Sequence, residues 1–241
     1  MGRLYNYIIE IMKKIVVLTG AGISVESGIK AFRSEDGLWE NHRVEDVATH
    51  SAWFRNPQLI LDFYNTMRAQ LESKQPNRAH ICLAEKEKDY EIVVVTQNVD
   101  NLHERAGSTH VIHLHGELTK ACSSSNETDE YCFVDIGYKP IKMGDKAKDG
   151  SQLRPQIVFF EEAVPNIEPA ARQVETADIM IIIGTSMQVY PAAGLIRYAK
   201  RDTPIFFVDP KPQVQSQPNL TIIAEPASTG VDKAFELIDK L

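Results

Sequence analysis

The sequence predicts an α/β fold: a Rossmann-like, doubly wound parallel sheet that carries a smaller inserted module. Short apolar segments rich in β-branched residues recur along the chain, as in strands that are buried on both faces of a parallel sheet. Segments with helical spacing separate most of them, which favours strand–helix–strand units. Two stretches break this alternation, and we interpret them as the module.

The individual elements follow from apolar runs and from capping residues. Asn56 followed by Pro57 marks a helix start, Asn77 marks another, and Gly107 marks a helix end. The predicted strands are residues 14–19, 92–96, 111–114, 157–160, 179–183 and 205–208. The predicted helices are residues 57–73, 77–88, 99–106, 191–200 and 231–241.

These elements indicate one domain over residues 1–241. The Rossmann-like core is expected to contain residues of about 12–30, 89–116 and 153–241. The module is expected to contain about 31–88, which is largely helical, and 117–152, which is polar, irregular and poor in periodicity. A chain of 241 residues is long enough for such an arrangement.

Composition narrows the class of protein. Hydrophobic residues make up 43% of the chain and charged residues 24%, as in ordinary globular proteins, and the net charge is −7. An acidic balance argues against nucleic acid as the partner. With neither a membrane-spanning apolar run nor a signal peptide, we expect no membrane partner and a cytoplasmic location. Cys82, Cys122 and Cys132 form no disulfide framework, which fits a reducing compartment.

A glycine-rich turn, Gly20-Ala21-Gly22, follows the first predicted strand. Glycines in this place let backbone amides approach a pyrophosphate closely, although a tight turn without a ligand has the same sequence. Val25 stands where the dinucleotide fingerprint has its third glycine, and no acidic residue ends an obvious second strand about twenty residues later. An ordinary dehydrogenase is therefore not the best fit.

Further motifs follow in the order of one known family. They are Gly28-Ile29-Lys30-Ala31-Phe32-Arg33, Gly37-Leu38-Trp39, Gln97-Asn98-Val99-Asp100, His113-Leu114-His115-Gly116-Glu117 and Gly184-Thr185-Ser186. With them the chain resembles the sirtuin family over roughly residues 14–230. The resemblance implies an NAD-dependent protein-lysine deacylase, a deacetylase above all, which releases nicotinamide and O-acyl-ADP-ribose. NAD is then the co-substrate, and acylated lysines of proteins are the partners.

The resemblance also implies an NAD site in a cleft between the core and the module. Phe32 and Arg33 match a loop that shields the reacting carbon from water. Gln97, Asn98 and Asp100 match the pocket for the nicotinamide ribose and carboxamide, which is a positioning task. The cofactor-binding residues implied are Gly20, Ala21, Gly22, Ser24, Phe32, Arg33, Trp39, Gln97, Asn98, Asp100, Gly184, Thr185, Ser186, Asp209 and Ala227. Of these, Asp209 stands where an asparagine usually contacts the adenosine.

The catalytic residues that the resemblance implies are His115, Asn98 and Asp100. In the family the acyl oxygen attacks the nicotinamide ribose, and the histidine then takes a proton from a ribose hydroxyl. An imidazole suits this task because its pKa lies near neutral pH. His113 lies two residues earlier, and we interpret it as structural. Without the motif, His115 would also be interpreted as structural.

The acyl pocket and the peptide strand depart from the family pattern. The residues implied for substrate are Ala48, Tyr64, Met67, Arg68, Val158 and Phe160. Relatives that remove acidic acyl groups pair the tyrosine with an arginine three residues later, where this chain has Met67. Arg68 is one residue further, about 100° around a helix axis, so a neutral acyl group is expected above succinyl. In the strand that pairs with the peptide, Glu161 replaces a glycine.

The cysteine pairs that hold zinc in most sirtuins are largely missing. The first pair is Cys122-Ser123-Ser124-Ser125, and Lys146 and Asp149 are found where the second belongs. A closed zinc site needs four well-placed ligands, so we expect no metal. Cys122 and Cys132 with a histidine or aspartate remain as a weaker alternative.

Three functions remain open on the sequence alone. The first is deacylation, and the second is ADP-ribosyl transfer or NAD hydrolysis on the same fold. The third is a non-catalytic NAD-binding sensor, which the zinc loss and Glu161 motivate. The natural substrates, the preferred acyl chain and the oligomeric state are not determined by the sequence.

Overall fold

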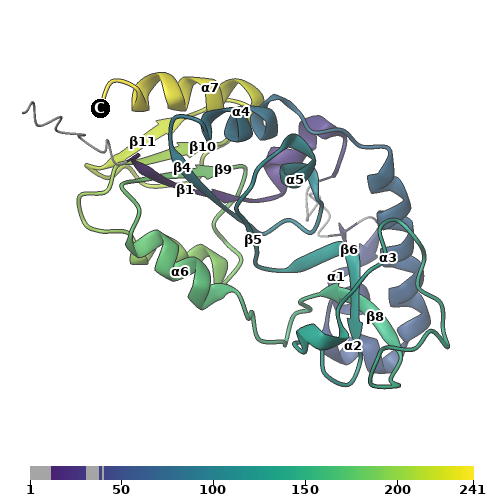
Figure 1. Cartoon of the computed structure of the whole chain (residues 1–241). Helices are drawn as coiled ribbons and strands as arrows, with labels where there is room; N and C mark the ends of the chain where they lie inside the picture. Colours follow the sequence, from purple (N-terminus) through teal and green to yellow (C-terminus); the bar gives the residue numbers. More distant parts are fainter. Residues whose placement is uncertain (1–11, 31–37, 40) are drawn as a thin grey trace, which may run out of the picture.

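The computed structural model describes residues 12–30, 38–39 and 41–241, which form a larger α/β core and a smaller module (Figure 1). The core contains a six-stranded parallel sheet in the order β11-β10-β9-β1-β4-β5. Its strands are β1 (Lys14–Thr19), β4 (Glu91–Thr96), β5 (Val111–His113), β9 (Ile179–Ile183), β10 (Ile205–Val208) and β11 (Leu220–Ile223). The direction of winding reverses between β1 and β9, which confirms the predicted doubly wound fold.

Helices cover both faces of this sheet. One face packs against α4 (Arg78–Lys86) and α7 (Ala227–Ile238), and the other against α6 (Ile167–Glu175) and the 3-10 helix η3 (Ala192–Tyr198) (Figure 1). Because both faces are covered, a strand such as β9 is apolar at every position rather than at alternate ones. Two short helices, η1 (Ala21–Ser27) and α5 (Leu102–Ala106), follow β1 and β4 near the carboxyl edge of the sheet.

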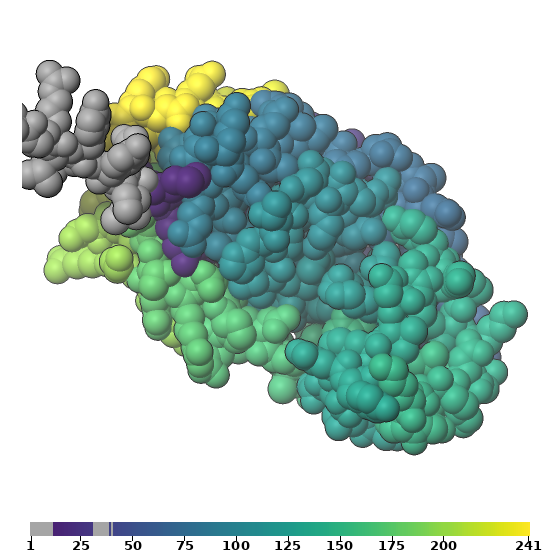
Figure 2. All heavy atoms as spheres, viewed as in Figure 1, coloured from purple at the N-terminus to yellow at the C-terminus, as the bar shows by residue number. Residues whose placement is uncertain are grey.

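The module has its own hydrophobic cluster and stands out from the core on one side (Figure 2). Its helices are α1 (Val44–Val47), α2 (His50–Arg55), α3 (Pro57–Glu72) and the 3-10 turn η2 (Glu130–Cys132). Its strands are the hairpin β2 (Leu38–Trp39) and β3 (His42–Arg43), and the antiparallel sheet β7 (Val134–Asp135), β6 (Gly116–Ser123) and β8 (Leu153–Ile157) in the order β7-β6-β8.

The module sheet differs most from the sequence-based expectation. The stretch 117–152, expected to be irregular, contributes β6 and β7. The strand expected at residues 157–160 instead ends at Ile157, and it pairs antiparallel with β6 rather than with the core sheet. A shift in register between Glu117 and Ala121 interrupts the alternation of side chains, which removes the period-two signal from the sequence.

Other differences concern the ends and types of helices. Residues 191–200, expected to be α-helical, form the 3-10 helix η3, and α5 begins only at Leu102 because residues 98–100 form a loop. The strand β11 and the helix α6 were not predicted, and α7 begins at Ala227, four residues before the predicted start.

The capping predictions are confirmed. The Asn56 side-chain oxygen accepts from the Leu59 amide, Asn77 caps α4, and Gly107 ends α5 at φ 106°. Among the described residues, no helix is both long enough and apolar enough to cross a bilayer.

Candidate active site

The glycine turn after β1 and the end of β9 are in direct backbone contact. The Gly20 amide donates to the Ile183 carbonyl at 3.1 Å, and the Gly22 amide donates to the Gly184 carbonyl at 2.8 Å. A Cβ on Gly22 would lie 2.5 Å from the Gly184 Cα, so no larger residue fits there without a shift of the backbone. The contact lies at the point where the strand order reverses, which is where open α/β sheets bind ligands.

A buried polar cluster joins this turn to the loop after β4. The Ser24 hydroxyl donates to the Asp100 carboxylate at 2.9 Å. The Asn98 side-chain amide donates to the Gly20 carbonyl and to the Ser24 hydroxyl, at 3.2 Å each. Burial raises the pKa of Asp100, while hydrogen bonds from the Leu102 amide and Ser24 oppose that rise. The structure therefore brings together Ser24, Asn98 and Asp100, each of which the resemblance implies at the cofactor.

The remaining residues expected at the cofactor follow neighbouring strands of the sheet. Thr185 follows β9 and accepts a hydrogen bond from the Gln97 side chain at 3.0 Å. Ser186 is exposed beside it, Asp209 follows β10, and Ala227 opens α7 after β11. Successive strand ends of a parallel sheet meet at one edge, so these positions share the edge that carries the glycine turn.

Three other residues expected at the cofactor are Trp39, Phe32 and Arg33. The Trp39 ring packs edge-on against Phe63 and Tyr64, with centroids 5.1 and 5.9 Å away, so it belongs to the module cluster. Phe32 and Arg33 lie outside the described residues.

His115 lies between β5 and β6 and is half-buried. Its Nδ1 is 3.0 Å from the Gln97 carbonyl oxygen. A carbonyl can only accept, so Nδ1 carries the proton and Nε2 is the basic nitrogen of the neutral ring. Burial lowers the pKa of His115, and the hydrogen bond to Gln97 opposes this only in part. The imidazole is therefore held neutral in one tautomer at neutral pH.

The turn that carries His115 also depends on a glycine. Gly116 has φ +84°, and a Cβ there would lie 2.0 Å from the Gln156 carbonyl oxygen. This close crossing of β6 and β8 brings the His115 carbonyl within 3.0 Å of the Val158 amide, which donates to it.

The segment after β8 links His115 to Ala48, a position expected in the acyl pocket. The Phe160 amide donates to the Ala48 carbonyl at 2.8 Å, and the His50 amide donates to the Phe160 carbonyl at 3.0 Å. Val158 is half-buried and the Phe160 side chain is 38% exposed. The predicted substrate residues Ala48, Val158 and Phe160 therefore lie along one segment, with His115 at its start.

The α3 residues expected in the acyl pocket differ in what they contact. Tyr64 is fully buried, its hydroxyl has no hydrogen-bond partner among the described residues, and Met67 packs against the module cluster. The Arg68 guanidinium is fully buried and donates to the Leu118 carbonyl and to the Asn65 side chain. Burial lowers the pKa of Arg68 to about 10. Arg68 thus joins α3 to β6.

Hydrogen bonds of the Ser123 hydroxyl join the module loops that carry Ser125 and Asp149, two of the positions where zinc ligands were expected. The Ser123 hydroxyl contacts the Asp149 carboxylate and the Ser151 hydroxyl, and it accepts from the amides of Ser125 and Asn126. The buried Cys122 thiol donates to the Pro155 carbonyl, and burial raises its pKa to about 12. Cys122 is the one thiol among these groups, whereas a closed zinc site takes four cysteine or histidine ligands.

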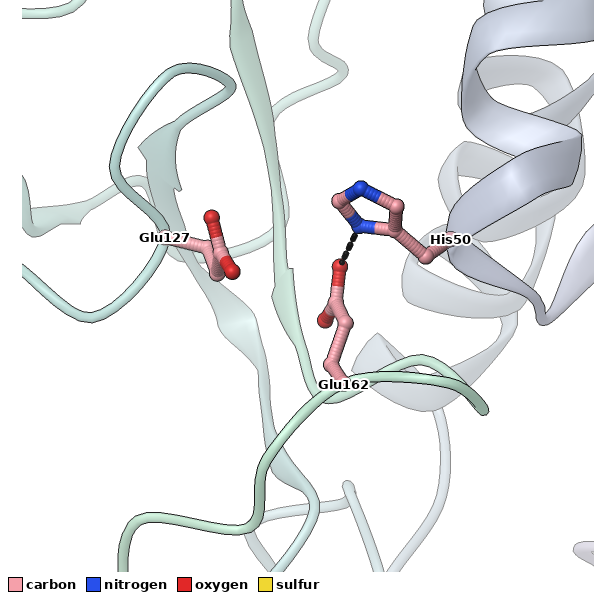
Figure 3. A group of neighbouring side chains, drawn as sticks. All are labelled: His50, Glu127 and Glu162. Carbon is pink, nitrogen blue, oxygen red and sulfur yellow. Dashed lines mark hydrogen bonds and ion pairs between the residues drawn. The ribbon is translucent and has the colours of Figure 1, made fainter.

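One trio of potential metal ligands, His50, Glu127 and Glu162, occurs among the described residues (Figure 3). The Glu162 carboxylate, however, already accepts from both terminal nitrogens of Arg154, at 2.6 and 2.9 Å, and from His50 at 2.7 Å. The Phe159 amide is a further donor to it. The Arg154 guanidinium already supplies the positive charge that a metal ion would bring, so this trio does not fit a divalent metal.

The Arg154–Glu162 ion pair is a feature that the sequence analysis missed. Both side chains are buried, and the Arg154 guanidinium also lies 4.1 Å from the centroid of the Phe159 ring. The pair therefore braces the segment that carries Val158 and Phe160. In the sequence, this arginine and this glutamate are eight residues apart, on either side of an apolar run. The spacing alone does not indicate that the segment folds back and brings the two side chains together.

The fold and the site define an α/β protein with a dinucleotide-type cradle, in which a neutral imidazole lies between the loop after β4 and the segment that begins at Val158. The Sir2 family profile matches residues 20–191, and the chain belongs to the Sir2 family.

Relatives and solved structures support this assignment over nearly the whole chain. A Bacteroides thetaiotaomicron protein named NAD-dependent protein deacylase is 52% identical over 232 residues, which is 94% of this chain and 98% of the relative. A Helicobacter pylori protein of the same name is 53% identical over 200 residues, covering 83% and 86%. A mutant Sir2 homologue solved with ADP-ribose has a TM-score of 0.84 at 36% identity, covering 95% and 93%. A Sir2 homologue–NAD complex has a TM-score of 0.79 at 36% identity, covering 95% and 90%.

Proposed function

We propose that this chain is an NAD-dependent protein-lysine deacylase that releases nicotinamide and O-acyl-ADP-ribose. The observation that carries the proposal is the position of His115. Its ring is fixed by the Gln97 carbonyl, in the loop that also carries Asn98 and Asp100, and its own carbonyl accepts from the Val158 amide. The names of the relatives at about 50% identity and the NAD and ADP-ribose complexes of structural neighbours support the same activity.

The residues present fit NAD as the co-substrate. The close backbone contact of Gly20 and Gly22 with the end of β9 leaves a turn without side chains, which suits a pyrophosphate. Asn98 and Asp100 offer an amide and a carboxylate for ribose hydroxyls and a carboxamide, and their mutual hydrogen bonds with Ser24 hold them in one geometry. When bound, NAD supplies the electrophilic ribose carbon.

His115 is the base in this proposal. Its Nε2 is unprotonated at neutral pH and is suited to accept a proton from a ribose hydroxyl. The segment from Val158 to Phe160 would hold the acylated peptide by strand addition, and this places the acyl-lysine next to the imidazole. A Sir2 structure with a peptide and NAD+ bound, at 27% identity and a TM-score of 0.71, supports this use of the fold.

A panel of acyl-lysine peptides with NAD tests the proposal. We expect release of nicotinamide that depends on acyl-peptide, together with O-acyl-ADP-ribose identified by mass. ADP-ribosylated protein would instead support ADP-ribosyl transfer, and free ADP-ribose without deacylation would support NAD hydrolysis. NAD binding without any release of nicotinamide would support a sensor.

We further propose a preference for acetyl or other neutral acyl groups over succinyl. Met67 offers an apolar wall, and the Arg68 guanidinium is engaged with Leu118 and Asn65. Met67→Arg should raise catalytic efficiency on succinyl-lysine peptides relative to acetyl-lysine peptides, whereas Met67→Leu, which preserves volume, should leave the ratio unchanged. A wild-type enzyme that prefers succinyl-lysine would contradict this proposal.

We also propose that the module needs no zinc, because hydroxyl and carboxylate hydrogen bonds around Ser123 join its loops. Metal analysis of the purified protein should find well under one zinc per chain. One equivalent that resists dialysis would overturn the proposal and would point to Cys122 and Cys132 as ligands.

A further inference from the structure

His113, two residues before the catalytic histidine, makes two hydrogen bonds of its own. It ends β5 with its side chain 7% exposed. Its Nδ1 is 3.0 Å from the Asn98 carbonyl oxygen, and its Nε2 is 2.7 Å from a Glu104 carboxylate oxygen on α5. A carbonyl and an ionised carboxylate both only accept, so both contacts are satisfied when the ring carries a proton on each nitrogen. The contacts therefore define an imidazolium, in contrast to the neutral ring of His115.

The electrostatic surroundings agree with this protonation state. Burial opposes a charge on His113, but the hydrogen bond and charge of Glu104, the charge of Glu117 and the Asn98 carbonyl raise its pKa. The pKa of Glu104 is lowered by His113, against the effect of burial. The titratable or charged groups that act on this pair or are affected by it are Asp100, His103, Glu117 and Lys120, and the groove beside His113 is also lined by Glu127, Glu130 and Glu162.

The pair acts on the peptide that carries Asn98. The Asn98 amide donates to the Thr96 hydroxyl at 3.0 Å, and the Asn98 carbonyl accepts from His113. Two consecutive carbonyls, those of Gln97 and Asn98, are thus held by two histidines in different charge states. Burial raises the pKa of Asp100, the charge of Glu104 adds to that rise, and the positive charge of His113 opposes it.

We propose that the Glu104–His113 ion pair is a positioning device that holds the Asn98–Asp100 loop in the geometry that binds the nicotinamide end of NAD. This inference rests on the proposed function for the identity of the ligand, and it assigns a role to a histidine that the sequence indicated only as structural. Neither side chain is assigned to contact the reacting atoms, so both are positioning residues.

The proposal has a pH signature, because the two histidines must be in opposite charge states. As pH falls through the lowered pKa of His115, the base is protonated and activity is lost on the acid side. As pH rises through the raised pKa of His113, one of its two hydrogen bonds is lost and NAD binding weakens on the alkaline side. In a plot of activity against pH, the fall at acid pH is therefore due to His115 and the fall at alkaline pH to His113.

Glu104→Gln tests the pair with little change in shape. Its amide oxygen still accepts from the ring, but the charge that keeps His113 protonated is gone. We expect the KM for NAD to rise about tenfold at pH 8, with a smaller change in kcat, and the alkaline limb to move to lower pH while the acid limb stays in place. Glu168→Gln is the control: it removes an exposed carboxylate paired with Arg172 on α6 and should leave the profile unchanged.

His113→Gln gives a second, independent measurement. Its amide nitrogen can still donate one hydrogen bond towards the Asn98 carbonyl and does not titrate, so the NAD affinity should be lower than wild type at pH 7 yet independent of pH up to 9. Isothermal titration calorimetry measures the NAD affinity directly and does not need turnover. If the wild type binds NAD but does not deacylate, the proposed function fails while this test still decides the role of the pair.

Two results would overturn the proposal. One is a Glu104→Gln pH profile and NAD affinity that coincide with those of the wild type. The other is a loss of activity in Glu104→Gln that is uniform across pH and is accompanied by a lower melting temperature with unchanged NAD affinity, because this indicates a structural role only. If His113→Gln does not fold, the Glu104→Gln data decide alone.

Discussion

The carboxyl edge of the core sheet and the module hold their functional residues in different ways. At the edge, the glycine turn meets the end of β9 through its backbone, with Gly22 against Gly184, and hydrogen bonds of Ser24 and Asn98 support it. In the module, contacts between side chains hold the loops together: Arg154 pairs with Glu162, and Ser123 bonds to Asp149.

The two kinds of contact differ in how strictly they limit the residue types that fit. A backbone approach of 2.5 Å admits only glycine, so the positions of the turn cannot change without moving the ligand site. A side-chain contact between loops, such as that of Ser123 with Asp149, restricts the residue type less, because other pairs of side chains can join the same loops.

His115→Ala is expected to have the largest effect on activity, because it removes the proposed base and leaves the contacts of both regions in place. Deacylation should fall about 10²- to 10⁴-fold, measured as O-acyl-ADP-ribose formation, while NAD affinity changes little. In the wild type, activity should decline on the acid side only below the ordinary pKa of histidine, since burial lowers the pKa of His115. Turnover retained in His115→Ala would remove the residue from its role.

Gly22→Ala tests the backbone contact at the sheet edge. A Cβ at this position meets the Gly184 backbone at 2.5 Å, so the turn must shift, and NAD binding should weaken at least about tenfold in a calorimetric titration. Gly194→Ala is the matched control, because its Cβ would meet no atom closer than 3.9 Å. Equal NAD affinity in the two variants would show that the contact does not shape the cradle.

Ser123→Ala tests the side-chain brace of the module. It leaves the amides of Ser125 and Asn126 without their protein acceptor, at a loss of about 0.5–1.5 kcal/mol of unfolding free energy. The melting temperature should fall by about 1–6 °C, while NAD affinity stays close to that of the wild type. The chelator EDTA should not lower the melting temperature of the wild type; a drop on chelation would point to a metal in place of the hydrogen bonds.

Substitutions of Glu161 should have the smallest effect on stability, and they separate backbone strain from side-chain contacts at one position. It has φ +78°, a conformation that favours glycine, and its carboxylate accepts from the amide and hydroxyl of Ser51. Glu161→Gly relieves the strain but loses both contacts, so its stability should change by less than about 1 kcal/mol. Glu161→Ala loses the contacts and keeps the strain, and denaturant unfolding should find it about 1 kcal/mol less stable than Glu161→Gly. The reverse order would contradict this account.

Much of the core could be predicted from the sequence. The strand Ile179–Ile183 has the bounds that its apolar run indicates, and the caps Asn56 and Gly107 act as their residue types predict. These features are local, since a buried parallel strand needs only an apolar run and a cap needs only a side chain or a glycine at one position.

The sequence by itself determined five of the six strands of the core sheet and the glycine turn, and its motifs implied which residues lie at the site. Only the tertiary structure decided which charges are paired: that His113 is an imidazolium on Glu104 while His115 is neutral on Gln97, and that Arg68 is engaged with Leu118. The physical reason is that protonation and ion pairing depend on burial and on partners distant in the sequence, and a linear pattern carries neither.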